Sequence, residues 1–283
     1  MSSINWFPGH MAKTIRQLRQ EFERSDIVIE ILDARLPVSS RNPIIDQCVQ
    51  EKHCHIIALT KIDLADPKAT SYWEKELRKV TPHVFCLNVL KKQGIKGLLT
   101  CCQAFADQKN KSKRFYISKI MVCGIPNVGK SHVINALAKK RVAAVQNKPG
   151  VTKQTRGIML GKHLEIMDTP GILWPKLDDQ TAAIKLALAK SIKQTILNDY
   201  QLVEWFLPFM AATYPDLLQK RYRIDADYDD LETYLDAIAS SMNWKTRDGE
   251  RDEPRLLRSI IDDFQRMNFG RCSLDLNVSS DVN

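Results

Sequence analysis

The sequence of 283 residues has no long hydrophobic run and no sign of a secretory leader. A membrane-spanning helix needs roughly 20 consecutive apolar residues, and no stretch approaches that length. Residues 11–26 are basic and amphipathic, as a mitochondrial leader would be, but Glu21, Glu23 and Asp26 are atypical of one. We therefore expect no membrane span and a cytoplasmic protein, with a bacterial cytosol favoured and the mitochondrial matrix as the alternative.

The sequence also lacks recognisable pairs of cysteines. Seven cysteines are scattered along the chain, and the neighbours Cys101 and Cys102 are too close for a relaxed disulfide. This pattern indicates reduced thiols. The His-Cys-His run at 53–55 is followed by no second pair of ligands at a suitable spacing, so the spacing does not predict a metal site there.

Acidic residues are scarce in the first part of the chain. Residues 1–175 carry 28 Lys and Arg against 14 Asp and Glu, a net charge of +14, whereas residues 176–283 carry 14 against 19, a net charge of −5. Such an excess of cations favours a polyanionic partner such as RNA. The alternative is a basic soluble domain without that partner.

The strongest motif is Gly-Ile-Pro-Asn-Val-Gly-Lys-Ser at 124–131, which has the spacing of a phosphate-binding loop. Residues 117–123 predict a strand before it, and residues 131–140 predict a helix after it. Backbone N–H groups in such a loop, and at the start of such a helix, face phosphate oxygens. We expect phosphate contacts from Asn127, Val128, Gly129, Lys130, Ser131 and His132.

Two side chains of this loop have specific roles. Lys130 is expected to place catalytic positive charge near the β- and γ-phosphates, and Ser131 to offer a hydroxyl to Mg²⁺. These features indicate a nucleoside triphosphate. They do not distinguish a kinase, an ATPase and a GTPase.

A second phosphate-directed motif is Asp-Thr-Pro-Gly at 168–171. Asp168 is expected to hold Mg²⁺ through a water, and the backbone N–H of Gly171 to face the γ-phosphate. The polar loop before this motif offers a metal ligand from Thr152 or Thr155, and we favour Thr152.

The base-reading motif lies earlier, at Thr60-Lys61-Ile62-Asp63. The Asp63 carboxylate can accept hydrogen bonds from N1–H and the exocyclic amine of guanine, a donor pair that adenine lacks. The stem of Lys61 is expected to lie over the base or the loop. Motifs of this kind usually begin with Asn, and the Thr60 hydroxyl still offers one hydrogen bond. Asn88 and Val89 are expected against the base.

The base-reading motifs therefore precede the phosphate-reading motifs, which rotates the usual order. An open α/β sheet tolerates this change because its two chain ends generally lie close together. The segment that joins the old ends is expected to be polar, exposed and flexible, and residues 107–114 have that composition.

The chain resembles the YlqF/RbgA family of circularly permuted ribosome-assembly GTPases. The resemblance covers nearly the whole chain and rests on these stretches: 5–13, 32–43, 60–66, 124–131, 149–152, 168–176, 214–222 and 269–275. It implies an α/β fold, with a permuted GTPase domain at 1–176 that includes the N-terminal Trp-Phe-Pro-Gly-His-Met segment, followed by a small all-α domain at 177–283. It also implies a monomer that binds GTP or GDP, contacts rRNA in the large ribosomal subunit, promotes its late maturation, and leaves after GTP hydrolysis.

Two further roles follow from the resemblance. Ile172 stands where a glutamine would orient the attacking water, so His10 is implied as the group that reaches the γ-phosphate on the ribosomal particle. Asn127 is implied to help hold K⁺ beside the phosphates. The alternatives are that His10 belongs to a turn before a helix and that Asn127 only shapes the loop.

The C-terminal region has helical periodicity at 178–197, 228–244 and 253–270. Arg255, Arg258 and Arg266 on the last of these segments contact RNA phosphates or form a solvated face.

Two other classes of function remain open. One is a small-molecule kinase, although no acceptor pocket or lid arginines can be located. The other is an rRNA-binding scaffold that senses GTP but hydrolyses it poorly.

Overall fold

The computed structural model describes residues 4–5, 16, 18–113, 115–138, 157–167, 176–177, 179–192, 197–224 and 230–276. Two compact units divide the chain: one is Met1–Lys176 with Asp275–Asn283, and the other is Leu177–Leu274. The sequence-based division had placed 275–283 with the helical part.

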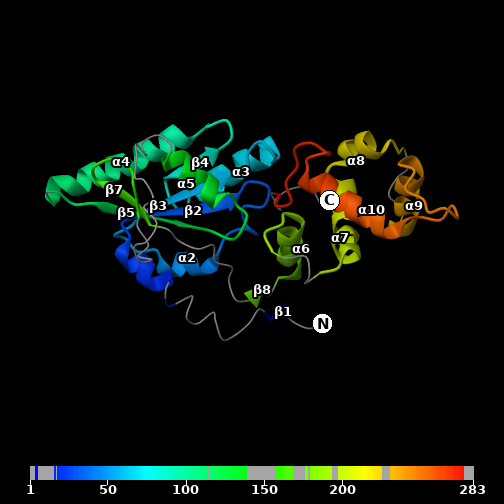
Figure 1. The fold of residues 1–283 in the computed structure, drawn as a ribbon, viewed down its shortest axis with the longest axis horizontal. Coiled ribbons are helices and arrows are strands. Elements are labelled where there is room, and N and C mark those ends of the chain that lie inside the picture. The colour runs from blue at the N-terminus through cyan, green and yellow to red at the C-terminus, as the bar shows by residue number, and fades with distance from the viewer. Residues whose placement is uncertain are drawn as a thin grey trace, which may run out of the picture. The chain divides into compact units, whose positions relative to one another are not determined.

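The first unit is built on a six-stranded sheet with the order β4-β3-β2-β5-β7-β6 (Figure 1). Its strands are β2 (Ile27–Asp33), β3 (Cys54–Thr60), β4 (Val84–Leu87), β5 (Ser118–Cys123), β6 (Ile158–Met159) and β7 (Leu164–Met167). All pair in parallel except β6, which runs antiparallel to β7. The predicted mostly parallel α/β sheet is therefore confirmed. Two short strands, β1 (Ile4–Asn5) and β8 (Lys176–Leu177), pair separately.

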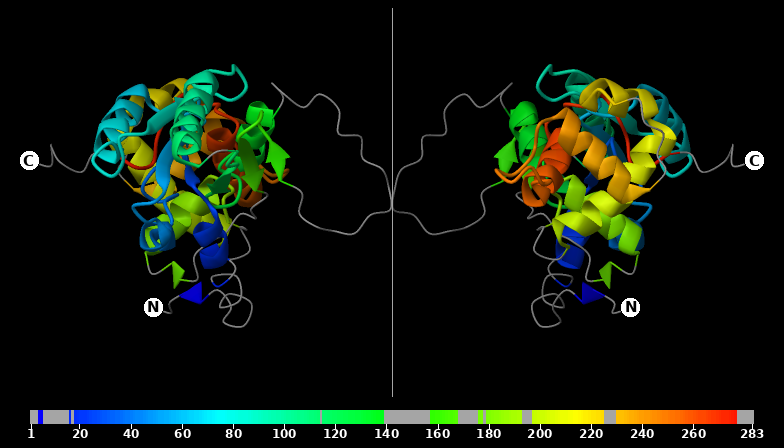
Figure 2. Two further views of the ribbon diagram at one scale, coloured as in Figure 1. Left: turned by 90° about the vertical axis from the view of Figure 1, so that its left-hand side faces the viewer. Right: turned by 90° about the vertical axis from the view of Figure 1, so that its right-hand side faces the viewer.

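Helices cover both faces of the sheet. They are α2 (Pro43–Cys48), α3 (Pro67–Leu77), α4 (Ile95–Ser112) and α5 (Lys130–Ala138). Figure 1 shows α4 and α5 on the side of the sheet opposite α2, and Figure 2 gives two further directions of view. Leu18 and Phe22 are each 2% exposed and pack with Val28 and Ile45. Apolar residues thus line both faces because parallel strands are covered on both.

The position of β5 explains why the rotated order is tolerated. This strand comes fifth in the chain, yet it lies in the middle of the sheet between β2 and β7. The carboxyl ends of parallel strands meet at one edge, so the segments that follow β2, β3, β4 and β5 approach one another there.

The predicted flexible join was wrong in one respect. Residues 107–112 belong to α4, which carries the chain from edge strand β4 back towards β5. Asp26 holds the end of this helix, because its carboxylate pairs with Lys109 and accepts hydrogen bonds from the Tyr116 hydroxyl and the Lys119 backbone N–H. The buried carboxylate therefore fixes a segment whose composition suggested flexibility.

The second unit is helical in its described residues, as predicted. Its helices are α6 (Gln180–Leu188), α7 (Asp199–Thr213), α8 (Pro215–Tyr222), α9 (Leu231–Ser241) and α10 (Glu253–Gln265). The ring of Phe206 lies 5.4 Å from that of Phe264 and 5.8 Å from that of Phe269, which forms an aromatic core. No helix in the described ranges is both long and apolar enough to cross a membrane.

Helix α6 ends earlier than its periodicity predicted. Lys190 adopts a φ of +59°, and the Ser191 N–H donates to the Leu186 carbonyl 2.8 Å away. A left-handed residue with such a bond caps a helix, so the turn closes α6 although the apolar pattern continues.

After the second unit, the chain returns to the first at Asp275, which is 4% exposed. Its carboxylate accepts hydrogen bonds from the Ser39 backbone N–H at 2.8 Å and hydroxyl at 2.9 Å. Its carbonyl accepts from Trp73 Nε1 at 2.9 Å. Asp275 is thereby fixed to the loop that follows β2 and to α3.

Candidate nucleotide-binding site

The phosphate-loop motif connects the end of β5 to the start of α5, as predicted. Gly124 has a φ of +145°, and a Cβ there would lie 2.5 Å from the Ile31 carbonyl oxygen. Gly129 has a φ of +103°, so it too needs the conformational freedom of glycine. Asn127 sits at a φ of +61°, a region that Asn adopts more readily than most residues. Asn127 therefore shapes the loop, and a role towards K⁺ stays a prediction.

Lys130 is the first residue of α5 and points back onto the loop. Its Nζ donates to the Ile125 carbonyl at 2.6 Å. Burial lowers the pKa of Lys130 to about 8, because the charged ammonium is partly removed from water. A bound phosphate would supply the negative charge that this cation lacks.

Thr60 joins the end of β3 to the phosphate loop. Its Oγ1 lies 2.5 Å from the Val128 carbonyl oxygen and 3.0 Å from that of Leu32. The hydroxyl has one proton to share between them. The one hydrogen bond that the Thr60 hydroxyl can donate is thus directed at backbone carbonyls in the protein, one of them in the phosphate loop, and not at solvent.

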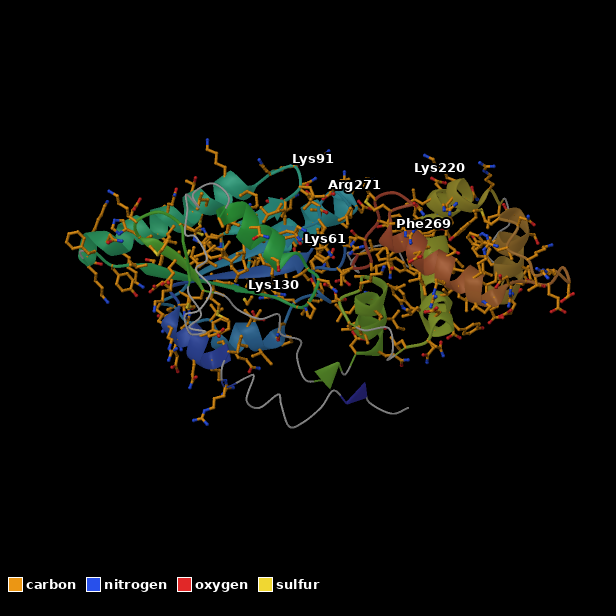
Figure 3. The ribbon with its side chains drawn as sticks, in the orientation of Figure 1. Lys61, Lys91, Lys130, Lys220, Phe269 and Arg271 are labelled. Carbon is orange, nitrogen blue, oxygen red and sulfur yellow. The ribbon has the colours of Figure 1, made fainter. Side chains whose placement is uncertain are left out.

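Lys61 makes a second bridge to the loop. It adopts a φ of +58°, and its Nζ lies 2.8 Å from Asp33 Oδ2 and 2.7 Å from the Asn127 carbonyl oxygen. Figure 3 labels Lys61 and Lys130, which come from β3's end and from α5. The Lys61 stem therefore spans from β2 to the phosphate loop.

Asp33, at the end of β2, is a site residue that sequence reasoning missed. Arg35 binds its carboxylate with two bonds, Nε to Oδ1 at 3.1 Å and Nη2 to Oδ2 at 2.8 Å. Burial alone would raise the pKa of Asp33, but the charges of Arg35 and Lys61 hold it well below its usual range. A useful signal was present, because Asp-Ala-Arg follows a buried strand at the edge where the other motifs lie.

The residues predicted to read the base line one pocket of about 220 Å³. The pocket gathers three separate segments: the end of β3, the turn after β4 and the start of α5. It is lined by Thr60, Lys61, Asp63, Leu64, Asn88, Val89, Leu90, Gly129 and His132. Asn88 also shapes its own turn, since its Oδ1 accepts from the Lys91 N–H at 3.1 Å.

Of the predicted metal ligands, the structure describes Ser131. It is exposed in the first turn of α5, where a hydroxyl can face a metal ion beside the phosphates. His10, Thr152, Asp168 and Gly171 lie outside the described residues, so their roles stay predictions.

A central parallel sheet, a phosphate loop at β5 and base-reading segments at β3 and β4 define a P-loop GTPase fold with permuted chain order. A family model described as "50S ribosome-binding GTPase" matches residues 119–235. The chain is 36% identical over 277 residues to Ribosome biogenesis GTPase A of Bacillus cereus, covering 96% of this chain and 93% of that protein. The chain belongs to the ribosome biogenesis GTPase A family.

Other relatives agree with this assignment. The Priestia megaterium Ribosome biogenesis GTPase A is 36% identical over 279 residues, with 96% of each chain covered. Mitochondrial ribosome-associated GTPase 1 of Xenopus tropicalis is 31% identical over 251 residues, covering 83% of this chain and 79% of that protein. The solved structure of GNP-bound YlqF from T. maritima shares the fold, with a TM-score of 0.65 at 23% identity over 93% of this chain and 98% of that one.

We predict that nucleotide affinity falls at alkaline pH because Lys130 loses its proton. Bound phosphates keep this lysine charged, so binding takes up a proton once the pH exceeds the pKa of about 8 in the free protein. The dissociation constant for GDP should rise about tenfold between pH 7 and pH 9. Isothermal titration calorimetry measures it.

The matched control is Lys130→Arg, whose guanidinium stays charged throughout this range. Any change in the affinity of this variant with pH therefore comes from protonation of the nucleotide itself. An affinity of the wild-type protein that follows the same pH profile as this variant would contradict the role of Lys130.

The Thr60 hydroxyl should contribute to nucleotide affinity through the loop. Thr60→Val keeps the shape but leaves the Val128 carbonyl without its donor, which costs about 1 kcal/mol, or a fivefold to tenfold weaker binding of GDP. Thr60→Ser keeps the hydroxyl and should bind within about twofold of the wild type. Equal affinities of the Val and Ser variants, measured by calorimetry, would show that the hydrogen bond is irrelevant to binding.

Proposed function

We propose that the protein hydrolyses GTP to GDP and phosphate as an assembly factor of the large ribosomal subunit. The observation that carries the proposal is the pocket of about 220 Å³, where Asp63, Asn88 and His132 from three segments converge beside the phosphate loop. Membership of the ribosome biogenesis GTPase A family supports the same conclusion. The alternative of a small-molecule kinase would also require a pocket for a phosphate acceptor, and the roles proposed for these residues do not involve one.

Asp63 supplies guanine selectivity in this proposal. Its carboxylate accepts the N1–H and exocyclic amine of the base, while Lys61 stays bound to Asp33 and to the loop. Because the wrong base would leave the carboxylate without donors, adenine nucleotides are disfavoured. The Thr60 hydroxyl and the Asn88 turn hold the two sides of the pocket.

Oxygen donors from Ser131, Thr152 and Asp168 suit Mg²⁺, a hard cation that prefers oxygen ligands. When bound, such an ion would supply positive charge that offsets the charge of the phosphates. Lys130 binds the β- and γ-phosphates and stabilises the transition state, and the backbone N–H of Gly171 faces the γ-phosphate. Asn127 helps to hold K⁺ beside the same phosphates.

The attacking water requires a group other than the residue after the Asp-Thr-Pro-Gly motif, because Ile172 has no polar atom in its side chain. His10 positions this water when the ribosomal particle is bound. An imidazole suits the role because it can donate or accept a proton near neutral pH.

rRNA is the proposed partner surface. The net charge of +14 over residues 1–175 supports contacts with phosphates. The second unit offers a cavity of about 640 Å³ lined in part by Lys220, Arg223 and Phe269, and Figure 3 labels the first and last of these. Arg255, Arg258 and Arg266 are exposed on or just after α10 and remain candidates for the same role. The protein acts as a monomer in a bacterial cytoplasm, or in the mitochondrial matrix.

Guanine selectivity is tested by Asp63→Asn. An asparagine offers an N–H donor in place of one acceptor, so the variant should lose about 100-fold in GDP affinity and bind xanthosine diphosphate better than the wild type does. Thr60→Ser serves as the control for a change in the same motif that keeps the acceptor. A variant that still prefers guanine would remove Asp63 from the base site.

Hydrolysis is tested by measuring phosphate release with and without immature large ribosomal subunits, in KCl and in NaCl. We expect strong stimulation by the particle, loss of that stimulation in His10→Ala, and slower turnover in NaCl. Stimulation retained in His10→Ala would exclude the histidine but keep the function. If the protein bound the particle only with GTP but released no phosphate in either salt, the proposed GTPase activity would be wrong and the GTP-sensing scaffold would take its place.

A further inference from the structure

A second cluster of chemically active side chains lies apart from the nucleotide pocket. It consists of Cys54, His83 and Cys101, whose ligand atoms all lie within 4.8 Å of one another. Cys54 is the first residue of β3, His83 directly precedes β4, and Cys101 lies within α4. Three elements of the first unit therefore meet at this point.

The cluster lies at the amino-terminal ends of the strands, whereas the nucleotide pocket lies at their carboxyl ends. Cys54 begins β3 and Thr60 ends it, so the full length of the strand separates the two sites. Cys54 is 7% exposed, whereas His83 and Cys101 are half-buried, so the cluster is accessible from one side. Nothing in the mechanism of GTP hydrolysis uses these residues.

One distance between ligand atoms matches that of a tetrahedral metal site. Cys101 Sγ lies 3.6 Å from His83 Nδ1, and Cys54 Sγ lies within 4.8 Å of both atoms. Bond lengths of about 2.3 Å to sulfur and 2.05 Å to nitrogen at a tetrahedral angle place sulfur and nitrogen about 3.6 Å apart. The three ligand atoms thus need little movement to surround one ion.

We propose that Cys54, His83 and Cys101 bind one thiophilic divalent cation of the Zn²⁺ class. Two thiolates and one neutral imidazole suit such an ion and balance its charge. Because these residues supply three ligands, a water molecule would complete a tetrahedral coordination. Binding releases protons from the thiols and ties β3, the segment before β4 and α4 together.

Sequence spacing could not reveal this site. The two histidines of the His-Cys-His run at 53–55 do not join the cluster. His53 Nε2 contacts the Phe22 carbonyl at 2.8 Å, and His55 Nε2 contacts Glu30 at 3.2 Å. The residue between them, Cys54, meets ligands that come from distant parts of the chain. The alternative to a metal site is a set of thiols and an imidazole joined only by hydrogen bonds.

The first experiment titrates Co²⁺ into the full-length protein, freed of metal and nucleotide and kept reduced with a phosphine. Co²⁺ reports thiolate ligation by an intense near-ultraviolet charge-transfer band, which oxygen ligands at the Mg²⁺ position do not give. We expect the band to saturate at one Co²⁺ per chain and to be displaced by Zn²⁺. Cys101→Ser and His83→Gln should each weaken binding at least tenfold.

Cys86→Ser is the matched control, because Cys86 is also a half-buried thiol in the first unit but contacts Glu74 instead of the cluster. It should retain the wild-type spectrum. No charge-transfer band in the wild type, or an unchanged band in both Cys101→Ser and His83→Gln, would overturn the proposal.

A second measurement needs no substitution and so is independent of folding defects. Alkylation of Cys101 by iodoacetamide, followed by mass spectrometry, should slow at least tenfold when Zn²⁺ is added, while alkylation of Cys86 in the same sample stays constant. Equal rates for Cys101 with and without Zn²⁺ would show that the cluster is held only by hydrogen bonds. GDP affinity should not change with Zn²⁺ in either outcome, because the two sites lie at opposite ends of the strands.

Discussion

The nucleotide site depends on one buried carboxylate at the end of β2. Asp33 is inaccessible to solvent, yet it stays charged because Arg35 binds both of its oxygens and Lys61 binds one. Without both cations, the carboxylate would be an uncompensated charge in the protein interior, which is strongly unfavourable. The carboxylate therefore orients Lys61 so that the lysine reaches the phosphate loop at the Asn127 carbonyl.

This arrangement makes the chain order unimportant for the chemistry. Thr60 at the end of β3 and the following Lys61 both contact carbonyls of the loop that follows β5, although the bonded residues are 68 and 66 positions apart in the chain. What the site requires is that the carboxyl ends of β2, β3, β4 and β5 share an edge of the sheet. The join through α4 restores this arrangement, and Asp26 secures it by binding the end of that helix and the start of β5.

Motifs whose chemistry is local were predictable from the sequence. The phosphate loop, the Thr60–Asp63 motif and the Asn88–Val89 pair all line one site, because each follows a strand of the same parallel sheet. Features set by distant partners were not predictable. Residues 107–112 are helical and their Lys109 pairs with the distant Asp26, and α6 ends at the left-handed backbone of Lys190 although its apolar pattern continues. Asp33 was not identified from the sequence, because Lys61 comes near it only when strands β2 and β3 lie side by side.

The anchoring of Asp275 fixes one of the two points at which the chain passes between the units. The helical unit is inserted into the first unit, since the chain leaves at Leu177 and returns at Asp275. The return point is bonded to Ser39 in the loop after Asp33 and Arg35, and the Asp275 N–H itself donates to the Arg35 carbonyl at 3.3 Å. The helical unit is therefore joined to the first unit by two covalent connections rather than by one. In the sequence, one connection follows the Asp-Thr-Pro-Gly motif; the other is hydrogen-bonded to Arg35, a partner of Asp33 in the ion pair that orients Lys61.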